Sequence, residues 1–296
     1  MLVRDDFAGA GGWSQALKLS GYSQDEIGYE NNPVAVATAR AAGHTRELID
    51  VLDVDSTEKL YGYLASPPCT PFSVAGKGEG KEILRQLIGN PGAAVDPKLK
   101  LFMHPFDVLV RQSPEWFIFE NVPFVMKYWK YMATLLDYNV KVVKLYADNY
   151  GVPQSRIRVF MIGSRGLFKV PAPTHDRYAA LKTEVHPDLP PPVSMRDALK
   201  LSPTITNQIS FYNKGGGDGG AGNRRATDLP SLTITSKSFA WEDTKGNRQI
   251  AGSQQGSVLQ SFPNDYPWYG NSKQRWLQIG NAVPPKLGAA IIKELL

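Results

Sequence analysis

The chain of 296 residues contains one cysteine, Cys69, within residues 66–73 (SPPCTPFS). One thiol cannot form an intramolecular disulfide, so a disulfide-stabilised scaffold is excluded. Prolines at positions 67, 68 and 71 exclude a helix interior and stiffen the backbone around the thiol. The apolar residues 60–65 predict a strand that runs into this turn. A cysteine on a rigid turn after a strand is typical of a nucleophile, and a small buried hydrophobe is the other common role of a free cysteine.

Residues 5–12 (DDFAGAGG) form a glycine-rich turn between a predicted strand over 2–6 and a helical run over 13–19. Glycines at such a turn let a ligand approach the backbone and leave helix N–H groups free. The turn is not a phosphate-binding P-loop, because no Gly-Lys-Ser/Thr follows it. A second predicted strand ends at Glu30, about twenty residues beyond the turn, where a carboxylate usually binds ribose hydroxyls. The turn and the acid together are typical of a nucleotide-type cofactor site.

Three more short motifs follow, at residues 117–122 (FIFENV), 154–158 (QSRIR) and 278–285 (QIGNAVPP). With the glycine-rich turn and Pro-Cys, they resemble the DNA (cytosine-5)-methyltransferase family. The signatures of that family are Phe-x-Gly-x-Gly-Gly, Pro-Cys, Glu-Asn-Val, Gln-x-Arg-x-Arg and Gly-Asn-x-Val. All five occur here in the family's order, from Phe7 to Pro285, so the resemblance covers nearly the whole chain.

The resemblance implies which residues carry out the reaction. Cys69 is implied as the nucleophile that adds to carbon 6 of cytosine, after which carbon 5 is enamine-like and accepts a methyl group. Glu120 is implied to hold ring nitrogen N3 and the exocyclic amine, and Arg158 the ring's carbonyl oxygen. Arg156 is expected on the same strand face, where it supports the catalytic loop and a backbone phosphate. A salt-bridged acid at a strand end and ordinary strand-edge arginines are the alternatives.

The implied cofactor is S-adenosyl-L-methionine, with S-adenosyl-L-homocysteine as the product. Phe7 is expected against the adenine, Glu30 on the ribose hydroxyls and Asn281 at the methionine end. Asp53 is similar to the acid that contacts the adenine amine, with Asp50 and Asp55 as alternatives. The full set expected to bind the cofactor is Phe7, Ala8, Gly9, Gly11, Gly12, Glu30, Asn31, Asp53, Val54, Pro68, Asn281 and Ala282.

The implied partner is double-stranded DNA. The residues expected to contact DNA are Ser73, Gln154, Arg224 and Arg225. The two arginines end the glycine-rich residues 214–225, which we interpret as a loop that orders on nucleic acid. A linker without a binding role is the alternative.

The elements that position these residues predict an α/β fold. Strand and helix signals alternate up to about residue 165, which is typical of a doubly wound, mostly parallel sheet. The resemblance makes this a Rossmann-like, S-adenosylmethionine-dependent methyltransferase domain over residues 1–172 and 256–296. Prolines cluster from residue 171, and the resemblance places a small target-recognition domain at 173–255. Residues 76–98, rich in glycine and lysine, predict a long mobile loop that closes over a substrate.

Composition limits the remaining possibilities. The net charge of +5 fits a polyanionic partner, although many enzymes with neutral substrates are equally basic. No apolar run is long enough to span a membrane, and residues 1–5 leave no room for a signal peptide, so we expect a soluble, cytoplasmic protein. The four histidines lack metal-ligand spacing, so no metal is expected. The resemblance further implies a monomer in a prokaryotic cell or phage-infected host, with a cognate restriction endonuclease as a candidate partner.

Several residues depart from the family pattern. Thr70 follows the cysteine where glutamine is usual, and Gln254 and Gln255 stand near the place of a usual Arg-Glu pair. Asp6 occupies a position that is usually apolar, and Asn32 one that is usually aspartate. The change at Gln254 and Gln255 concerns the support of the recognition domain and not the chemistry, and neither Asp6 nor Asn32 touches the reacting atoms.

Two alternative functions remain open. An RNA cytosine-5 methyltransferase of the same superfamily keeps Glu-Asn-Val but often lacks a separate recognition domain, so the 173–255 segment favours DNA. A catalytically silent DNA-binding relative is the other alternative. The presence of Cys69, Glu120, Arg158 and Asn281 argues against it.

Overall fold

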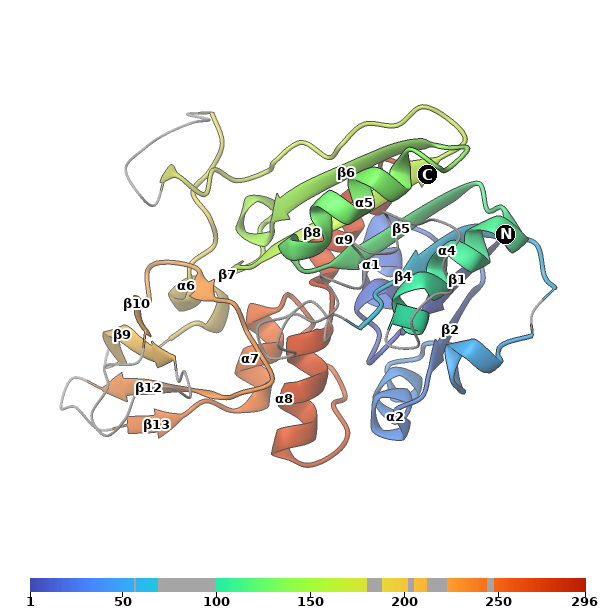
Figure 1. Ribbon diagram of the computed structural model, residues 1–296. Helices are drawn as coiled ribbons and strands as arrows, with labels where there is room; N and C mark the ends of the chain where they lie inside the picture. Colours follow the sequence, from blue (N-terminus) through green and yellow to red (C-terminus); the bar gives the residue numbers. More distant parts are fainter. Residues whose placement is uncertain (56, 69–98, 180–187, 202–204, 212–222, 244–247) are drawn as a thin grey trace.

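The computed structural model describes residues 1–55, 57–68, 99–179, 188–201, 205–211, 223–243 and 248–296. Its main feature is a seven-stranded sheet with the strand order β3-β2-β1-β4-β5-β8-β6 (Figure 1). The strands are β1 (Leu2–Asp6), β2 (Glu26–Glu30), β3 (Arg46–Leu48), β4 (Leu60–Ala65), β5 (Trp116–Asn121), β6 (Asn139–Tyr146) and β8 (Ile157–Ser164). β8 pairs antiparallel with β5 and β6, and the remaining pairs are parallel. The predicted doubly wound, mostly parallel α/β fold is therefore confirmed.

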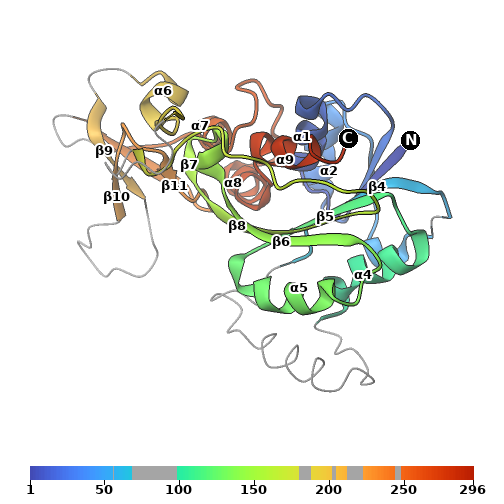
Figure 2. The same cartoon turned by 90° about the horizontal axis from the view of Figure 1, so that it is seen from above.

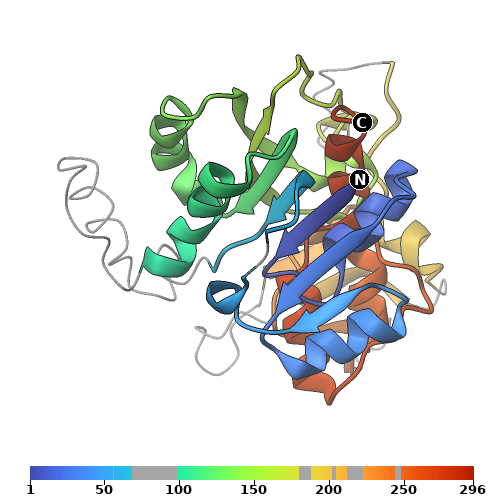
Figure 3. The ribbon, with the colours of Figure 1, turned by 90° about the vertical axis from the view of Figure 1, so that its right-hand side faces the viewer.

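Helices cover both faces of this sheet, as Figure 2 shows. α1 (Gly12–Ser20) and α9 (Pro285–Ile292) pack together on one face, where Trp13, Phe160 and Ile291 share an apolar core. α4 (Lys100–Gln112) and α5 (Met126–Ala133) lie on the other face, over a core that includes Phe117 and Trp129. β5 is buried along its whole length between the two layers, as its unbroken apolar run predicts. The pairing of α9 with α1 brings the C-terminal segment back to the first strand, and Figure 3 shows the two chain ends near each other.

Local capping explains where the helices near the first strands begin. α2 (Pro33–Ala41) begins with a proline, and the Asn32 side chain accepts hydrogen bonds from the Val34 and Ala35 amides. Asn32 thus performs the capping that an aspartate at this position would perform. The described residues also form short 3-10 helices, namely η1 (Val51–Asp53), η5 (Pro123–Val125) and η6 (Ala147–Tyr150).

The third strand differs from the expectation. A strand over 48–52 is suggested by the apolar residues there, but β3 ends at Leu48 and η1 follows. The reason is Asp50, whose side chain accepts a hydrogen bond from the Leu52 amide and starts the turn. Short-range side-chain bonding therefore outweighs apolar character at this position.

A second, smaller sheet lies beside the first, at the left of Figure 1. Its antiparallel order is β10-β9-β12-β13, built from β9 (Ile205–Phe211), β10 (Asn223–Ala226), β12 (Phe239–Asp243) and β13 (Arg248–Ile250). Residues 212–222 lie outside the described residues, but Arg224 and Arg225 belong to β10 rather than to a loop, which corrects the interpretation of the whole 214–225 segment.

Further elements join the small sheet to the seven-stranded sheet. β11 (Ser231–Leu232) pairs with β7 (Gln154–Ser155). The helices α6 (Met195–Leu199), α7 (Ser253–Leu259) and α8 (Ser272–Asn281) pack beside the small sheet. One apolar core unites residues from the small sheet, such as Trp241, with Leu259 of α7 and Trp276 of α8. α7 and α8 thus pack with both parts, and a domain boundary between residues 255 and 256 stays a prediction.

Candidate active site

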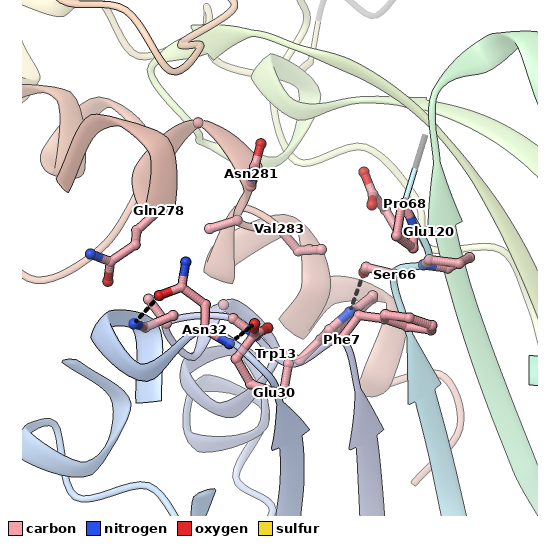
Figure 4. A pocket seen from close by; sticks show the side chains of 18 of the residues that line it. Phe7, Trp13, Glu30, Asn32, Ser66, Pro68, Glu120, Gln278, Asn281 and Val283 are labelled. Carbon is pink, nitrogen blue, oxygen red and sulfur yellow. Dashed lines mark hydrogen bonds between the residues drawn. The ribbon is translucent and has the colours of Figure 1, made fainter. Parts of the chain in front are cut away.

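A cavity of about 360 Å³ opens at the carboxyl ends of β1, β2, β4 and β5. Doubly wound sheets bind ligands at this edge, where the strand order changes direction between β1 and β4. The cavity collects residues that are far apart in the chain (Figure 4). The predicted site residues that line it are Phe7, Ala8, Gly9, Gly12, Glu30, Asn31, Pro68, Glu120, Arg156, Arg158, Asn281 and Ala282.

The glycine-rich turn is fixed to the end of β2 by Glu30. One carboxylate oxygen of Glu30 accepts from the Gly9 amide at 2.9 Å, and the other accepts from the Asn32 amide at 2.8 Å. Gly9 has a φ of 52°, a left-handed conformation that favours glycine, and a Cβ at this position would meet no atom within 4 Å. The turn therefore leaves open space beside an anchored carboxylate.

The start of α1 leaves backbone donors available next to this turn. Gly11 is the N-cap residue, with a φ of 103°, and no side chain caps the helix. The first amides of an uncapped helix attract polar or negatively charged ligand groups. Gly11 itself does not line the cavity, and its direct contact with a cofactor stays a prediction.

Glu120 and Arg158 form an ion pair on adjacent antiparallel strands. Arg158 Nε lies 2.9 Å from Glu120 Oε1, and the two side chains are 17% and 8% exposed. Both residues line the cavity. Glu120 is thus salt-bridged at a strand end, as the alternative interpretation has it, but the pair faces the site. An acceptor and a cation side by side suit the polar edge of a heterocyclic base.

The segment that leads to the cysteine is anchored at this cavity. Trp13 Nε1 donates to Ser66 Oγ at 3.0 Å, and Asn121 Nδ2 donates to the Pro67 carbonyl at 3.0 Å. The Trp13–Ser66 bond is drawn in Figure 4. Cys69 and Ser73 lie outside the described residues, as do residues 76–98, so their predicted roles are not located by the structure. Pro68, next to the cysteine, lines the cavity.

Arg156 occupies a different place from the one predicted. It lies between β7 and β8 and is 2% exposed. Its Nη1 donates to the Ile234 carbonyl at 3.1 Å and its Nη2 to the Gly280 carbonyl at 3.0 Å. A guanidinium enclosed on protein carbonyls does not reach a DNA phosphate, and the phosphate assignment is corrected. Arg156 instead connects the segment before the small sheet's β12 to the end of α8, next to Asn281.

Gln154 is also an internal connector. Its side chain is fully buried, and its Oε1 accepts from the Ile234 amide at 2.8 Å. Its Nε2 donates to the Leu259 carbonyl at 3.3 Å and to Gln260. This burial contradicts a direct DNA contact, because every described polar atom of the side chain is engaged inside the protein.

The candidate acids after β3 differ in their place relative to the cavity. Asp53 is exposed in η1, and neither Asp53 nor Val54 lines the cavity. Asp50 and Val51 do line it. The contact of any of these acids with an adenine stays a prediction.

The two arginines predicted to contact DNA, Arg224 and Arg225, both lie in β10. Arg225 Nε donates to the Pro230 carbonyl at 3.0 Å and its Nη2 to Ser155 Oγ at 3.4 Å. Its guanidinium is thus partly engaged at the junction between β7 and β10. The backbone of Arg224 pairs with Ser210 of β9, and its contact with DNA stays a prediction.

Several cavity residues were not singled out from the sequence. They are Tyr29, Ser66, Leu101, Val122, Leu277, Gln278 and Val283, together with Trp13 of α1. Ser66, Val122, Gln278 and Val283 lie within the quoted motifs, so their position in a motif was the signal that could have identified them. Leu101 is the second residue of α4 and carries no sequence signal, because only the fold brings it to this edge.

Two features are absent from the described residues. Within that part of the chain, no three His, Cys, Asp or Glu side chains are grouped as metal ligands would be. None of the helices described is both long and apolar enough to cross a membrane.

Known proteins are similar to this chain in sequence. The family model described as C-5 cytosine-specific DNA methylase matches residues 1–255 and 207–296. Type II methyltransferase M1.HphI of Haemophilus parahaemolyticus is 29% identical over 99% of this chain and 86% of its own length. Type II methyltransferase M.AplI of Arthrospira platensis is 28% identical over 100% of this chain and 85% of its own length.

Solved structures share the fold. The S. pombe Dnmt2 methyltransferase superposes with a TM-score of 0.70 at 18% identity, over 100% of this chain and 98% of that one. The Entamoeba histolytica methyltransferase EhMeth gives a TM-score of 0.70 at 16% identity, over 100% and 97%. With the family model matching the chain from end to end, this protein belongs to the C-5 cytosine-specific DNA methylase family.

Proposed function

We propose that the protein transfers a methyl group from S-adenosyl-L-methionine to carbon 5 of a cytosine flipped out of double-stranded DNA. The reaction proceeds through a covalent bond between Cys69 and carbon 6. The observation that carries the proposal is the convergence on one cavity of the Glu120–Arg158 pair, the Glu30-anchored turn and the segment that leads into Cys69. The family match to DNA methylases supports the choice of substrate.

The residues around the cavity fit the cofactor. Glu30 supplies carboxylate acceptors for ribose hydroxyls, since each oxygen has a second lone pair beyond its bond to a backbone amide. Phe7 supplies an apolar wall for the adenine, and Asp50 an acceptor near it. The open space at Gly9 and the uncapped start of α1 suit the amino-acid end. When bound, S-adenosyl-L-methionine supplies an electrophilic methyl group.

The base-binding residues have distinct tasks. A protonated Glu120 carboxyl donates to N3 of the flipped cytosine and accepts from its exocyclic amine, and Arg158 donates to its carbonyl oxygen. Both contacts stabilise the negative charge that the ring gains when the Cys69 thiolate adds to carbon 6. Carbon 5 then acts as a nucleophile, and loss of its proton releases the thiolate and restores the ring. Inside a stacked duplex neither carbon is accessible to this attack, so the base must leave the helix.

A mechanism-based trap tests the covalent step. A duplex with 5-fluorocytosine at the target holds the enzyme after methyl transfer, because fluorine cannot leave as a proton does. The wild-type protein should form an adduct that survives denaturing electrophoresis, and Cys69→Ala should form none while keeping the wild-type Tm. An RNA oligonucleotide of the same sequence is the control for the RNA alternative. An adduct formed by Cys69→Ala would refute the assignment.

We also propose that the protein works as a monomer beside a cognate restriction endonuclease. The similarity to the Type II methyltransferases M1.HphI and M.AplI supports the second part. Size-exclusion chromatography with light scattering checks the first. Digestion of methylated and unmethylated DNA by extracts of the source cells checks the second.

A further inference from the structure

A buried polar cluster lies on the α4 face of β1, and the proposed reaction makes no use of it. Its members are Arg4, Asp6, Tyr63 and His104, each no more than 4% exposed. Three of them come from the sheet, and His104 comes from α4. Asp6 is one of the residues at which the sequence departs from the family pattern. Charged groups in a core need a specific arrangement to be tolerated there.

Asp6 is the centre of the cluster. Its carboxylate accepts from Arg4 Nε at 2.8 Å and Arg4 Nη2 at 3.0 Å, which balances its charge. It also accepts from Tyr63 Oη at 2.7 Å, and His104 Nε2 lies 3.0 Å from the same oxygen. Burial alone raises the pKa of Asp6, but the hydrogen bonds from His104, Arg4 and Tyr63 outweigh burial and hold the pKa below its ordinary value. Asp6 is thus an anion that binds His104 Nε2 as a donor.

His104 connects this anion to the cavity. Its ring meets the Phe7 ring edge-on, with centroids 6.2 Å apart and planes at 89°. Phe7 lines the cavity and has a φ of 59°, a strained conformation for a residue with a bulky side chain. Such a conformation persists only where its surroundings hold it. Leu101, one helical turn before His104 on α4, lines the same cavity.

We propose that Asp6 and His104 are a positioning pair for the adenine end of the cofactor site. Asp6 fixes the orientation of the His104 ring, and the ring holds Phe7 in its left-handed conformation against the cavity. The same hydrogen bond ties the first turn of α4 to β1 and so places Leu101. Neither residue of the pair touches the reacting atoms. The inference rests on the proposed function, because it assigns the adenine to the Phe7 side.

The test compares two variants that remove different hydrogen bonds from the same oxygen of Asp6. His104→Leu removes the bond and the aromatic edge that meets Phe7. Tyr63→Phe removes a bond of similar length and keeps the ring, whereas the ring contact with Phe7 belongs to His104. The measurements are the Kd for S-adenosyl-L-homocysteine by calorimetry without DNA, the KM and kcat, and the Tm.

We expect both variants to lower the Tm, and His104→Leu alone to weaken S-adenosyl-L-homocysteine binding, about five- to tenfold. Its KM for S-adenosyl-L-methionine should rise with little change in kcat at saturation. His104→Gln, which keeps a donor for Asp6, should recover part of the affinity. Asp6→Asn carries the same test if His104→Leu does not fold, with an expected loss of affinity of about threefold or more.

Three results would overturn the inference. One is wild-type affinity in His104→Leu alongside a lowered Tm, since that describes a purely structural residue. Another is an equal loss of affinity in Tyr63→Phe and His104→Leu, because the effect would then not pass through Phe7. The third is a wild-type protein that does not bind S-adenosyl-L-homocysteine, and this one alone would also refute the proposed function.

Discussion

At the scale of single residues, the two carboxylates of the site are held by different partners. Glu30 accepts hydrogen bonds from two backbone amides, which orient its carboxylate without neutralising the charge. Glu120 has a cation, Arg158, as its partner. A carboxylate held by amides remains available as a further acceptor, which suits ribose hydroxyls. A carboxylate beside a guanidinium presents an acceptor and donors together, which suits a base edge.

Replacing Glu30 should weaken cofactor binding specifically. Loss of charge-assisted hydrogen bonds costs roughly 1.5–3 kcal/mol, so Glu30→Ala should raise the Kd for S-adenosyl-L-methionine about ten- to hundredfold. The matched control is Glu47→Ala, an exposed acid on the adjacent strand β3. Calorimetry with each variant provides the measurement. Unchanged cofactor affinity in Glu30→Ala, with the fold intact, would contradict the assigned role.

Gln154 shows how a motif residue can serve the fold instead of the substrate. Its replacement by alanine leaves the buried Ile234 amide without its acceptor. We expect Gln154→Ala to lower the free energy of unfolding by roughly 1–3 kcal/mol. The salt dependence of DNA binding should stay as in the wild type, since no phosphate contact is lost.

Urea denaturation and a salt series of binding measurements separate these effects. Gln249→Ala, at an exposed position of β13, is the control for the loss of an amide side chain. A variant with normal stability but a reduced salt slope would restore Gln154 to the DNA interface.

At the scale of elements, the sequence predicted the large sheet well and the small one poorly. Local sequence patterns identify β1, β2, β4 and β5, because each strand is an apolar run followed by turn residues. The small sheet forms between segments whose pairing depends on distant partners, as where β12 pairs with β9. Local sequence does not encode such partners. The same limit explains why Gln154 and Arg156 were expected at the DNA surface, since a motif gives a residue's type but not its burial.

At Gly28 in β2, the side chain of Arg46 packs directly against the backbone. A Cβ at Gly28 would lie 1.2 Å from Nη1 of Arg46 and 2.8 Å from the Ala8 Cβ. The Arg46 side chain is fully buried between β2 and α1, where its Nη2 donates to Ser14, so it has little room to move. Overpacking of this kind costs typically 1–3 kcal/mol. We therefore expect Gly28→Ala to lower the free energy of unfolding by about that amount.

Urea denaturation of Gly28→Ala measures this effect. Gly166→Ala is the control, because its Cβ would meet only one atom within 4 Å, at 3.8 Å. Wild-type stability in Gly28→Ala would mean that Arg46 can rearrange, and the contact would then not explain the glycine.

At the scale of the whole molecule, hydrogen bonds connect the segment between β11 and β12 to the cavity. Ile234, just before the small sheet's β12, bonds to both Gln154 and Arg156. Arg156 continues to Gly280, the residue before Asn281 of the cavity. The segment between β11 and β12 is therefore joined by direct hydrogen bonds to the edge of the proposed cofactor site. Under the proposed function, this connection holds the DNA duplex and the flipped base in one fixed geometry.

If the enzyme flips its target cytosine, its DNA affinity should depend on how firmly that base is paired. Extrusion costs a few kcal/mol of stacking and pairing, and less at a mismatch. Bisulfite sequencing of DNA from cells that express the protein first identifies the target site. Duplexes of that site are then compared at one salt concentration, with the cytosine paired to guanine, mispaired at the target, or mispaired several base pairs away. We expect about tenfold tighter binding for the target mismatch alone. Equal affinity for all three duplexes would mean that the base is not extruded in the bound state, and the covalent step would lose its access to carbon 6.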